Sequence, residues 1–257
     1  GVDTEREIVD RKSEGTRTVW VATSDDDGES WSKPREITES TKNTDDWTWY
    51  ATGPGIGVQL RSNRLLIPCD HINSTTGVWA SHVIFSDDHG KSWKLGGAAP
   101  PKTNECQAVE LADGRVLLNM RNYNREHKCR ALATSADGGE TFSEVAYDEA
   151  LVEPVCQASI LRDSTAENGG KSRILFSNPG ETDKRKEMTV RLSYDECQTW
   201  PVGKVLWAGP AAYSCLGRLG DGTMLCLYER GLNTPYEKIT LARFGLEWLT
   251  DARDTAK

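Results

Sequence analysis

The chain has 257 residues, which suits one large all-β domain or two ordinary domains and allows a sizeable buried core. Its formal net charge of -8 argues against a nucleic-acid partner, because the phosphate backbone binds basic surfaces. No stretch approaches the roughly 20 apolar residues that cross a bilayer, so we expect no membrane segment. Charged residues of both signs are dispersed, which predicts no disordered tail.

Seven cysteines and four histidines set the expectations for metals and redox chemistry. The number of cysteines is odd, and none has the Cys-x-x-Cys spacing of a zinc or redox site, so buried or unpaired thiols are expected. The histidines, at positions 71, 82, 89 and 127, form no metal-ligand motif. We therefore expect neither a metal site nor a cofactor.

A repeat of the form Ser-x-Asp-x-Gly-x-Ser/Thr-aromatic, the Asp box, occurs four times. Its Ser and Asp side chains can bond backbone N–H groups across a tight turn, and its Gly supplies a positive φ. Each copy follows a strand-like run, so the copies are predicted to be hairpin turns with structural aspartates. The spacing suits one four-stranded propeller blade per copy. The copies are residues 24–31, 86–93, 135–142 and 193–200, with Asp26, Asp88, Asp137 and Asp195.

A second repeat lies between the boxes and consists of two strand-like runs joined by a turn containing Gly, Asn or Asp. Asp-Gly in particular is a strong hairpin signal. Each blade is therefore predicted to hold an inner hairpin followed by an outer hairpin that carries the box, with no domain linker and no internal helix. The inner hairpins are expected at residues 57–67, 108–118, 158–176 and 215–226, the third with a loop at 163–172.

Two Asp-Gly turns, at 113–114 and 221–222, predict the register of their hairpins. If each is a two-residue loop, the open ends of both hairpins carry polar residues. Open ends of inner hairpins share one face of a propeller, so these groups should converge at one mouth, although charged hairpin ends are also common at plain solvent-exposed surfaces. The facing pairs are Cys106 with Arg121, next to Glu105, and Ser214 with Glu229, next to Tyr213.

The boxes and six further motifs resemble exo-α-sialidases (neuraminidases) of the bacterial and animal type, from about Thr18 to the C-terminus. The resemblance implies a six-bladed β-propeller, a single catalytic domain over residues 1–257, and hydrolysis of terminal α-linked sialic acids from glycoproteins, glycolipids or oligosaccharides. Sialylated glycans are the implied partners, no obligate protein partner is evident, and a secreted, periplasmic or lysosomal location is favoured. The motifs are Thr52-Gly53-Pro54-Gly55, Asn104-Glu105-Cys106-Gln107, Leu118-Asn119-Met120-Arg121, Phe176-Ser177-Asn178-Pro179, Ala212-Tyr213-Ser214 and Leu227-Tyr228-Glu229.

The resemblance also implies roles for five residues. Tyr213 would be the nucleophile of a retaining mechanism, with Glu105 as its activating partner. Arg121 and Arg185 would bind the substrate carboxylate as the second and third of three arginines, and Glu229 would orient the first. These residue types suit the chemistry, because the sugar carboxylate repels an anionic nucleophile and Arg binds a carboxylate with two hydrogen bonds.

Three more residues are candidates for a sugar subsite, with ordinary loop residues as the alternative interpretation. A turn at 62–63 would place Asp70 and His71 opposite the segment 53–55. Gln157 would stand at the open end of the hairpin at 158–176.

The first box, at Ser24, matches the family's second box, so the sequence predicts that the N-terminal blade is missing and about five blades are present. The first triad arginine and the acid/base Asp would belong to that blade. The chain by itself is therefore expected to be inactive or nearly so, and unstable, because an incomplete propeller leaves strand edges unpaired. The alternative function is a non-catalytic Asp-box propeller that binds sialylated glycans or a protein partner. The sequence does not distinguish a hydrolase from a trans-sialidase.

Overall fold

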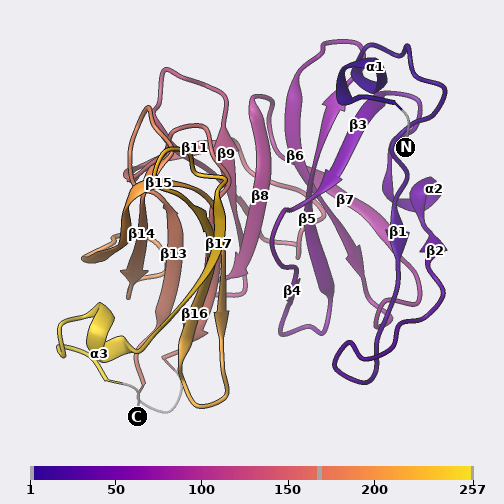
Figure 1. Cartoon of the computed structure of the whole chain (residues 1–257). Coiled ribbons are helices and arrows are strands. Elements are labelled where there is room, and N and C mark those ends of the chain that lie inside the picture. The colour runs from indigo at the N-terminus through magenta and orange to yellow at the C-terminus, as the bar shows by residue number, and fades with distance from the viewer. Residues whose placement is uncertain (1–2, 167–169, 256–257) are drawn as a thin grey trace.

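The computed structural model describes residues 3–166 and 170–255, and antiparallel β-sheets make up most of it (Figure 1). The sheets follow one another in chain order, from the N-terminal side at the right of Figure 1 to the C-terminal side at the left. A two-stranded sheet pairs β1 (Trp20–Val21) with β2 (Arg35–Glu36). The next sheet contains β3 (Trp47–Thr52), β4 (Val58–Gln59), β5 (Leu65–Asn73), β6 (Trp79–Ser86) and β7 (Lys94–Ala98). A four-stranded sheet follows, made of β8 (Thr103–Glu110), β9 (Val116–Asn122), β10 (Cys129–Ser135) and β11 (Ala146–Val152).

The last sheet joins two strand groups through one long strand. Its order is β12 (Ser159–Ser164), β13 (Arg173–Pro179), β14 (Lys186–Ser193), β15 (Val202–Arg218), β16 (Met224–Arg230) and β17 (Lys238–Phe244). The first part of β15 pairs with β14 and the second part pairs with β16. Part of the expected loop at 163–172 lies outside the described residues.

Among the described residues, three short helices correct the prediction that the chain has no internal helix. They are α1 (Glu5–Val9), α2 (Thr38–Thr41) and α3 (Leu246–Leu249). Each has only four or five residues, which is too short to show the 3.6-residue hydrophobic period that identifies a helix in a sequence.

The core lies between successive sheets, because each sheet presents apolar side chains to the next. Leu66 and Val83 of the β3–β7 sheet pack with Leu118 of the following sheet. On its other face that sheet packs through Leu117 against Phe176 of β13. The inner strands are therefore covered on both sides, which explains why β13 is buried along nearly its whole length. An all-β fold of stacked antiparallel sheets is thus confirmed, and the number of blades stays a prediction.

The Asp boxes have the predicted structural role, as the second copy illustrates. Asp88 accepts hydrogen bonds from the backbone N–H of Ser92 at 2.8 Å and from its hydroxyl at 2.6 Å. Ser86 in turn accepts from the N–H of Gly90 at 2.8 Å, which closes the turn between β6 and β7. The other three copies repeat these contacts through Asp26, Asp137 and Asp195.

The inner hairpins are present, but their predicted register is wrong by one residue. Cys106 faces Met120 and Ser214 faces Tyr228. The reason is turn length, because Leu111 pairs with Arg115 around a three-residue loop that ends in Gly114 at φ 89°. The loop that ends in Gly222 repeats this geometry.

Both ends of the row of sheets expose apolar side chains. β17 is the edge strand of the last sheet, and Ile239 and Leu241 on it are 75 and 53 % exposed, while Leu227 on the neighbouring β16 is 47 % exposed. At the opposite end, Trp20 and Trp31 are 55 and 65 % exposed. No described residue covers these side chains, so both end sheets present apolar surface of the kind that other sheets of the molecule bury.

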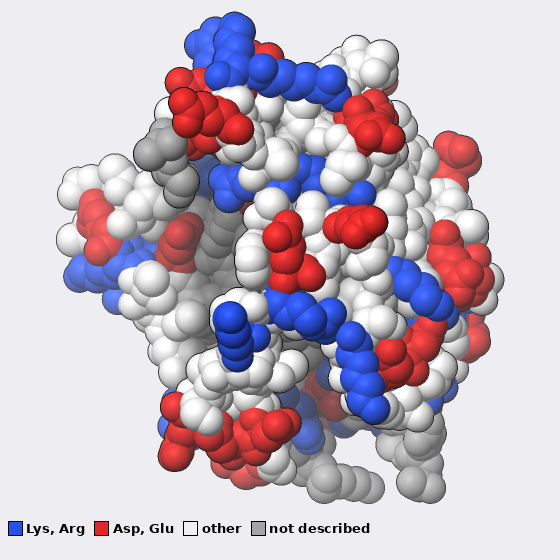
Figure 2. Space-filling model, turned by 90° about the vertical axis from the view of Figure 1, so that its right-hand side faces the viewer, with Lys and Arg blue, Asp and Glu red and all other residues white. Residues whose placement is uncertain are grey.

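The distribution of charged residues, the hydropathy of the helices and the state of the cysteines agree with the expectations from the composition. Figure 2 shows acidic and basic side chains interspersed over the face it presents. Among the described residues, no helix is long and apolar enough to cross a membrane. All seven cysteines, which lie in the described ranges, are free thiols, and every one except Cys215 is buried, as predicted.

Candidate active site

Two β-bulges place the central polar residues of the site. The pairing of β8 with β9 shifts between Thr103 and Cys106, and the pairing of β15 with β16 shifts between Ala211 and Ser214. A bulge changes the direction in which side chains point. The first bulge includes Glu105, a predicted site residue. The second bulge carries Tyr213 in the same way. The irregular backbone therefore brings together groups that a regular register would separate.

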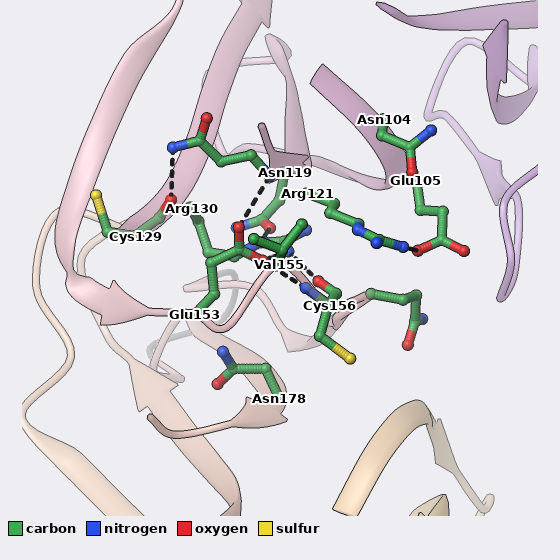
Figure 3. A network of polar contacts seen from close by, with 12 residues as sticks. Asn104, Glu105, Asn119, Arg121, Cys129, Arg130, Glu153, Val155, Cys156 and Asn178 are labelled. Atoms are coloured by element: carbon green, nitrogen blue, oxygen red, sulfur yellow. Dashed lines mark hydrogen bonds and ion pairs between the residues drawn. The ribbon is translucent and has the colours of Figure 1, made fainter. Parts of the chain in front are cut away.

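The phenol, carboxylate and guanidinium predicted for the site are in direct contact. The Tyr213 hydroxyl donates a hydrogen bond to Glu105 Oε1 at 2.5 Å. Arg121 Nη1 donates to Glu105 Oε2 at 2.7 Å and to the Tyr213 hydroxyl oxygen at 3.3 Å. Figure 3 shows the Arg121 side chain reaching from its strand to Glu105. Three strands, β8, β9 and β15, thus meet at one polar cluster.

The electrostatics of this cluster keep the phenol neutral. Burial raises the pKa of Tyr213 well above its ordinary value of 10.0, and the hydrogen bond to Glu105 raises the pKa further. The Glu105 carboxylate already accepts the phenol proton in a hydrogen bond, so it stands where a general base must stand. The arrangement therefore provides an uncharged phenol with an acceptor for its proton.

A second guanidinium lies over the face of the phenol ring. Arg185 immediately precedes β14, and its guanidinium carbon lies 5.6 Å from the centre of the Tyr213 ring. Its Nη2 donates to the Val155 carbonyl at 2.9 Å, and its Nη1 donates to the Tyr236 hydroxyl at 2.9 Å. Neither Val155 nor Tyr236 was a sequence candidate, because nothing in their local patterns distinguishes them from ordinary loop residues.

Two guanidinium nitrogens of Arg121 have no hydrogen-bond partner among the described residues. Its Nε is buried without a hydrogen-bond partner, and its Nη2 forms no hydrogen bond with the described residues. A buried unpaired donor is costly unless a ligand satisfies it. Arg121 and Arg185 can therefore supply charge-assisted hydrogen bonds to an anion placed between them.

Glu229 and Gln157 hold the backbone of β15 on either side of the Tyr213 peptide. Glu229 Oε2 accepts from the Tyr213 N–H at 3.1 Å. Gln157 accepts from the Ser214 N–H at 3.0 Å and donates to the Ser214 carbonyl at 2.9 Å. Both side chains line an apolar pocket of about 180 Å³ next to Tyr213. Glu229 forms no ion pair with any described residue, so its carboxylate has no guanidinium to orient.

Asp70 and His71 are not placed as predicted. Asp70 pairs with Ala51 and His71 with Tyr50, so neither lies opposite the segment 53–55. The two-residue turn assumed at 62–63 is longer, since Leu60 pairs with Arg64.

Asp70 borders the active site, whereas the His71 ring packs in the interior. Asn104, the neighbour of Glu105, donates to Asp70 Oδ1 at 3.0 Å. Burial, and then the Glu105 charge, raise the pKa of Asp70 to about 8. The His71 ring stacks on Trp47 with a centroid distance of 3.6 Å, and burial lowers its pKa to about 4. Among the described residues, no group of three His, Cys, Asp or Glu side chains is arranged to hold a metal ion.

The sheets and their Asp-box turns define the general class of the molecule. Residues 7–226 match a family model described as a BNR repeat-like domain, so the chain belongs to that class of repeat proteins. Comparisons with individual proteins narrow the class further.

The chain is 39% identical to a sialidase of Micromonospora viridifaciens, over 89% of this chain and 35% of the relative. It is 36% identical to a sialidase of Bacteroides fragilis strain YCH46, over 83% of this chain and 40% of the relative. It thus spans well under half the length of these two curated relatives. Among solved structures, "Hadza microbial sialidase Hz136" matches with a TM-score of 0.81 and 36% identity, covering 90% of this chain and 44% of that one. The chain is a member of the exo-α-sialidase family.

Proposed function

We propose that this chain carries most of the active site of an exo-α-sialidase, which hydrolyses terminal α-linked sialic acids with retention of configuration. The observation that carries the proposal is the contact of Tyr213 with Glu105 and Arg121. A propeller that only bound glycans would need the Asp boxes, but it would not need a neutral phenol hydrogen-bonded to a carboxylate. The relatives named sialidases support the same reaction class.

The first chemical step follows from this geometry. As the Tyr213 oxygen forms a bond to the anomeric carbon, the phenol proton passes to Glu105, and the bond from that carbon to the leaving oxygen breaks. Sialic acid carries a carboxylate on the same carbon, so an anionic nucleophile would be repelled and a neutral phenol is not. Water then attacks the anomeric carbon from the face that the leaving group vacated, opposite the tyrosyl oxygen, and the bond from that carbon to Tyr213 breaks. Glu105 returns its proton to the phenol, and the proton lost by water passes to the group that protonated the leaving oxygen, so the two inversions retain the configuration.

Substrate binding is assigned to the two guanidiniums. Arg121 has free donors next to the Tyr213 hydroxyl, and Arg185 lies over the phenol ring, so the sugar carboxylate would contact both beside the reacting carbon. Gln157 and Glu229 would act indirectly, by fixing the Tyr213 peptide and the pocket beside it.

The described residues do not supply every group that the proposed reaction requires. Glu229 lacks a guanidinium partner, although the family resemblance gives it one, and the leaving oxygen needs a proton donor that no described residue is assigned to supply. The uncovered apolar ends of the row of sheets agree with a propeller that requires further strands to close into six blades. We therefore expect the full-length protein to be active and this chain alone to be nearly inactive.

A fluorogenic sialoside tests the function on the full-length protein. Tyr213→Phe and Glu105→Gln should each reduce kcat by about 100-fold or more, because each removes the nucleophile or its base. Tyr147→Phe is the matched control, since its hydroxyl lies on the outer strand β11 and bonds only Asn124. NMR of the first sugar released should show the α-anomer. Unchanged turnover in Tyr213→Phe, or an inverted first product, would refute the proposal.

A further inference from the structure

A fully buried ion pair lies behind the two guanidiniums of the active site. Arg130 on β10 and Glu153, just after β11, are both 0 % exposed, and Arg130 Nη1 lies 2.8 Å from Glu153 Oε2. Removing two charges from water is costly, and well-packed apolar residues often stabilise a fold equally well. Stability alone therefore does not explain why an ion pair occupies this buried position.

One set of contacts from this pair reaches the strand that carries Arg121. Arg130 Nε donates to the Asn119 side-chain oxygen at 2.7 Å, and Glu153 Oε1 accepts from the Asn122 N–H at 2.9 Å. Asn119 and Asn122 flank Arg121 on β9. The end of β9 is thus held on both sides of the first guanidinium.

A second set of contacts reaches the turn that holds Arg185. Arg130 Nη1 donates to the Cys156 carbonyl at 2.7 Å, and Glu153 Oε2 accepts from the Cys156 N–H at 3.1 Å. Between Glu153 and Cys156 lies Val155, at φ 56°, a conformation that β-branched residues rarely adopt. Such backbone persists where surrounding contacts over-determine it. The Val155 carbonyl is the acceptor that orients Arg185 Nη2 at 2.9 Å.

We propose that the Arg130–Glu153 pair is a positioning device that fixes the spacing of Arg121 and Arg185 and so sets the affinity for the substrate carboxylate. Figure 3 shows the two side chains between Asn119 and the segment Val155–Cys156, with dashed lines to both. The pair touches no substrate atom, and it acts through β9 on one side and through the Val155 carbonyl on the other. This inference rests on the proposed function of the two arginines.

The test uses the full-length protein and the double variant Arg130→Met/Glu153→Leu, which removes both charges at similar volume. The Kd for the 2,3-didehydro analogue of sialic acid, measured by calorimetry, and the KM for a fluorogenic sialoside should both rise about tenfold, because charge-assisted hydrogen bonds are weakened. The kcat should change much less. A merely structural role would lower the active fraction, and hence the apparent kcat, without changing Kd or KM.

A matched control and a coupling experiment sharpen the result. Arg173→Met/Asp254→Leu removes another mostly buried ion pair, whose side chains form no hydrogen bond with the described site residues, and should leave Kd unchanged. In an Arg185→Lys background the Arg130/Glu153 change should raise Kd by a smaller factor than in the wild type, because the part of its effect that passes through Arg185 is already lost. An unchanged Kd in the Arg130/Glu153 variant, or fully additive effects with Arg185→Lys, would overturn the inference.

Three further outcomes are distinguishable. If the double variant fails to fold, Arg130→Lys retains the charge but not the guanidinium fork, and its Kd should still rise; no rise would refute the inference. If Arg185→Lys alone leaves Kd unchanged, the proposed role of Arg185 fails, and the positioning device fails with it. If Arg185→Lys weakens binding and the Arg130/Glu153 change does not, only the positioning device is wrong.

Discussion

The buried carboxyl of Asp70 makes the stability of this chain depend on pH in an unusual direction. Its side chain is 2 % exposed, and burial with the neighbouring Glu105 charge raises its pKa from 3.8 to about 8. In the unfolded chain the same carboxyl ionises near its ordinary value. Between about pH 4 and pH 8 the folded state therefore holds a proton that the unfolded state has released, and stability falls as the pH rises.

The size of the effect follows from the width of this interval. Roughly four pH units separate the two pKa values, and each is worth about 1.4 kcal/mol, so the effect is on the order of 5 kcal/mol at most. Asp70→Asn keeps an oxygen that accepts from Asn104 but cannot ionise. Relative to the wild type, the variant should gain stability steadily from pH 4 to pH 8 and gain no more above pH 8. Urea unfolding of both proteins at a series of pH values measures the difference.

Asp26→Asn is the matched control for the same substitution. The Asp-box hydrogen bonds lower the pKa of Asp26 to about 2, with Ser30 as the main partner. The stabilisation from this group is fully present above pH 4 and is lost only as the pH falls toward 2. The difference between wild type and Asp26→Asn should therefore stay constant from pH 4 to pH 8. If Asp70→Asn also runs parallel to the wild type, the argument about Asp70 is wrong.

Three further predictions concern separate parts of the molecule. Arg121→Met in the full-length protein should lower kcat/KM by about 100-fold or more, because it leaves Glu105 without its ion-pair partner and removes a carboxylate donor. Asp88→Asn should lower the Tm in a thermal melt, because it weakens two hydrogen bonds that close the turn after β6. In native protein Cys215 should react with a thiol reagent before Cys69, whose pKa burial raises to about 12; the reverse order would contradict the structure.

The sequence was a good guide to the parts of the fold that repeat. Four Asp boxes and four inner hairpins recur with recognisable turn residues, so their existence and order could be predicted. Glu105, Arg121 and Tyr213 could be assigned because the family motifs name them, and the structure places them in contact.

The register of those hairpins could not be predicted in the same way. An Asp-Gly turn fits both two-residue and three-residue loops, and one residue of difference turns every side chain to the other face. The bulge before Cys106 then shifts the pairing once more. Two local irregularities together decide where Glu105 points, and neither has a sequence signal.

The supporting residues were missed for a different reason. Arg130 looks like an ordinary charge on a strand before a box, and Glu153 looks like a loop residue before a proline. Their importance comes mainly from contacts between residues 11 to 31 positions apart, and only the packed structure shows those contacts. His71 shows the opposite error, because an assumed two-residue turn at 62–63 suggested a subsite and the ring instead stacks on Trp47.

The single strand β15 links the fourth Asp box to Tyr213 without a loop between them. Its first part pairs with β14 and its second part with β16, so the distance between box and phenol is set by this one strand together with the bulge between Ala211 and Ser214. One inserted or deleted residue before Tyr213 would turn the phenol away from Glu105. Natural variants of this protein should therefore vary in length at turns such as residues 74–77 and keep a constant length from Val202 to Tyr213.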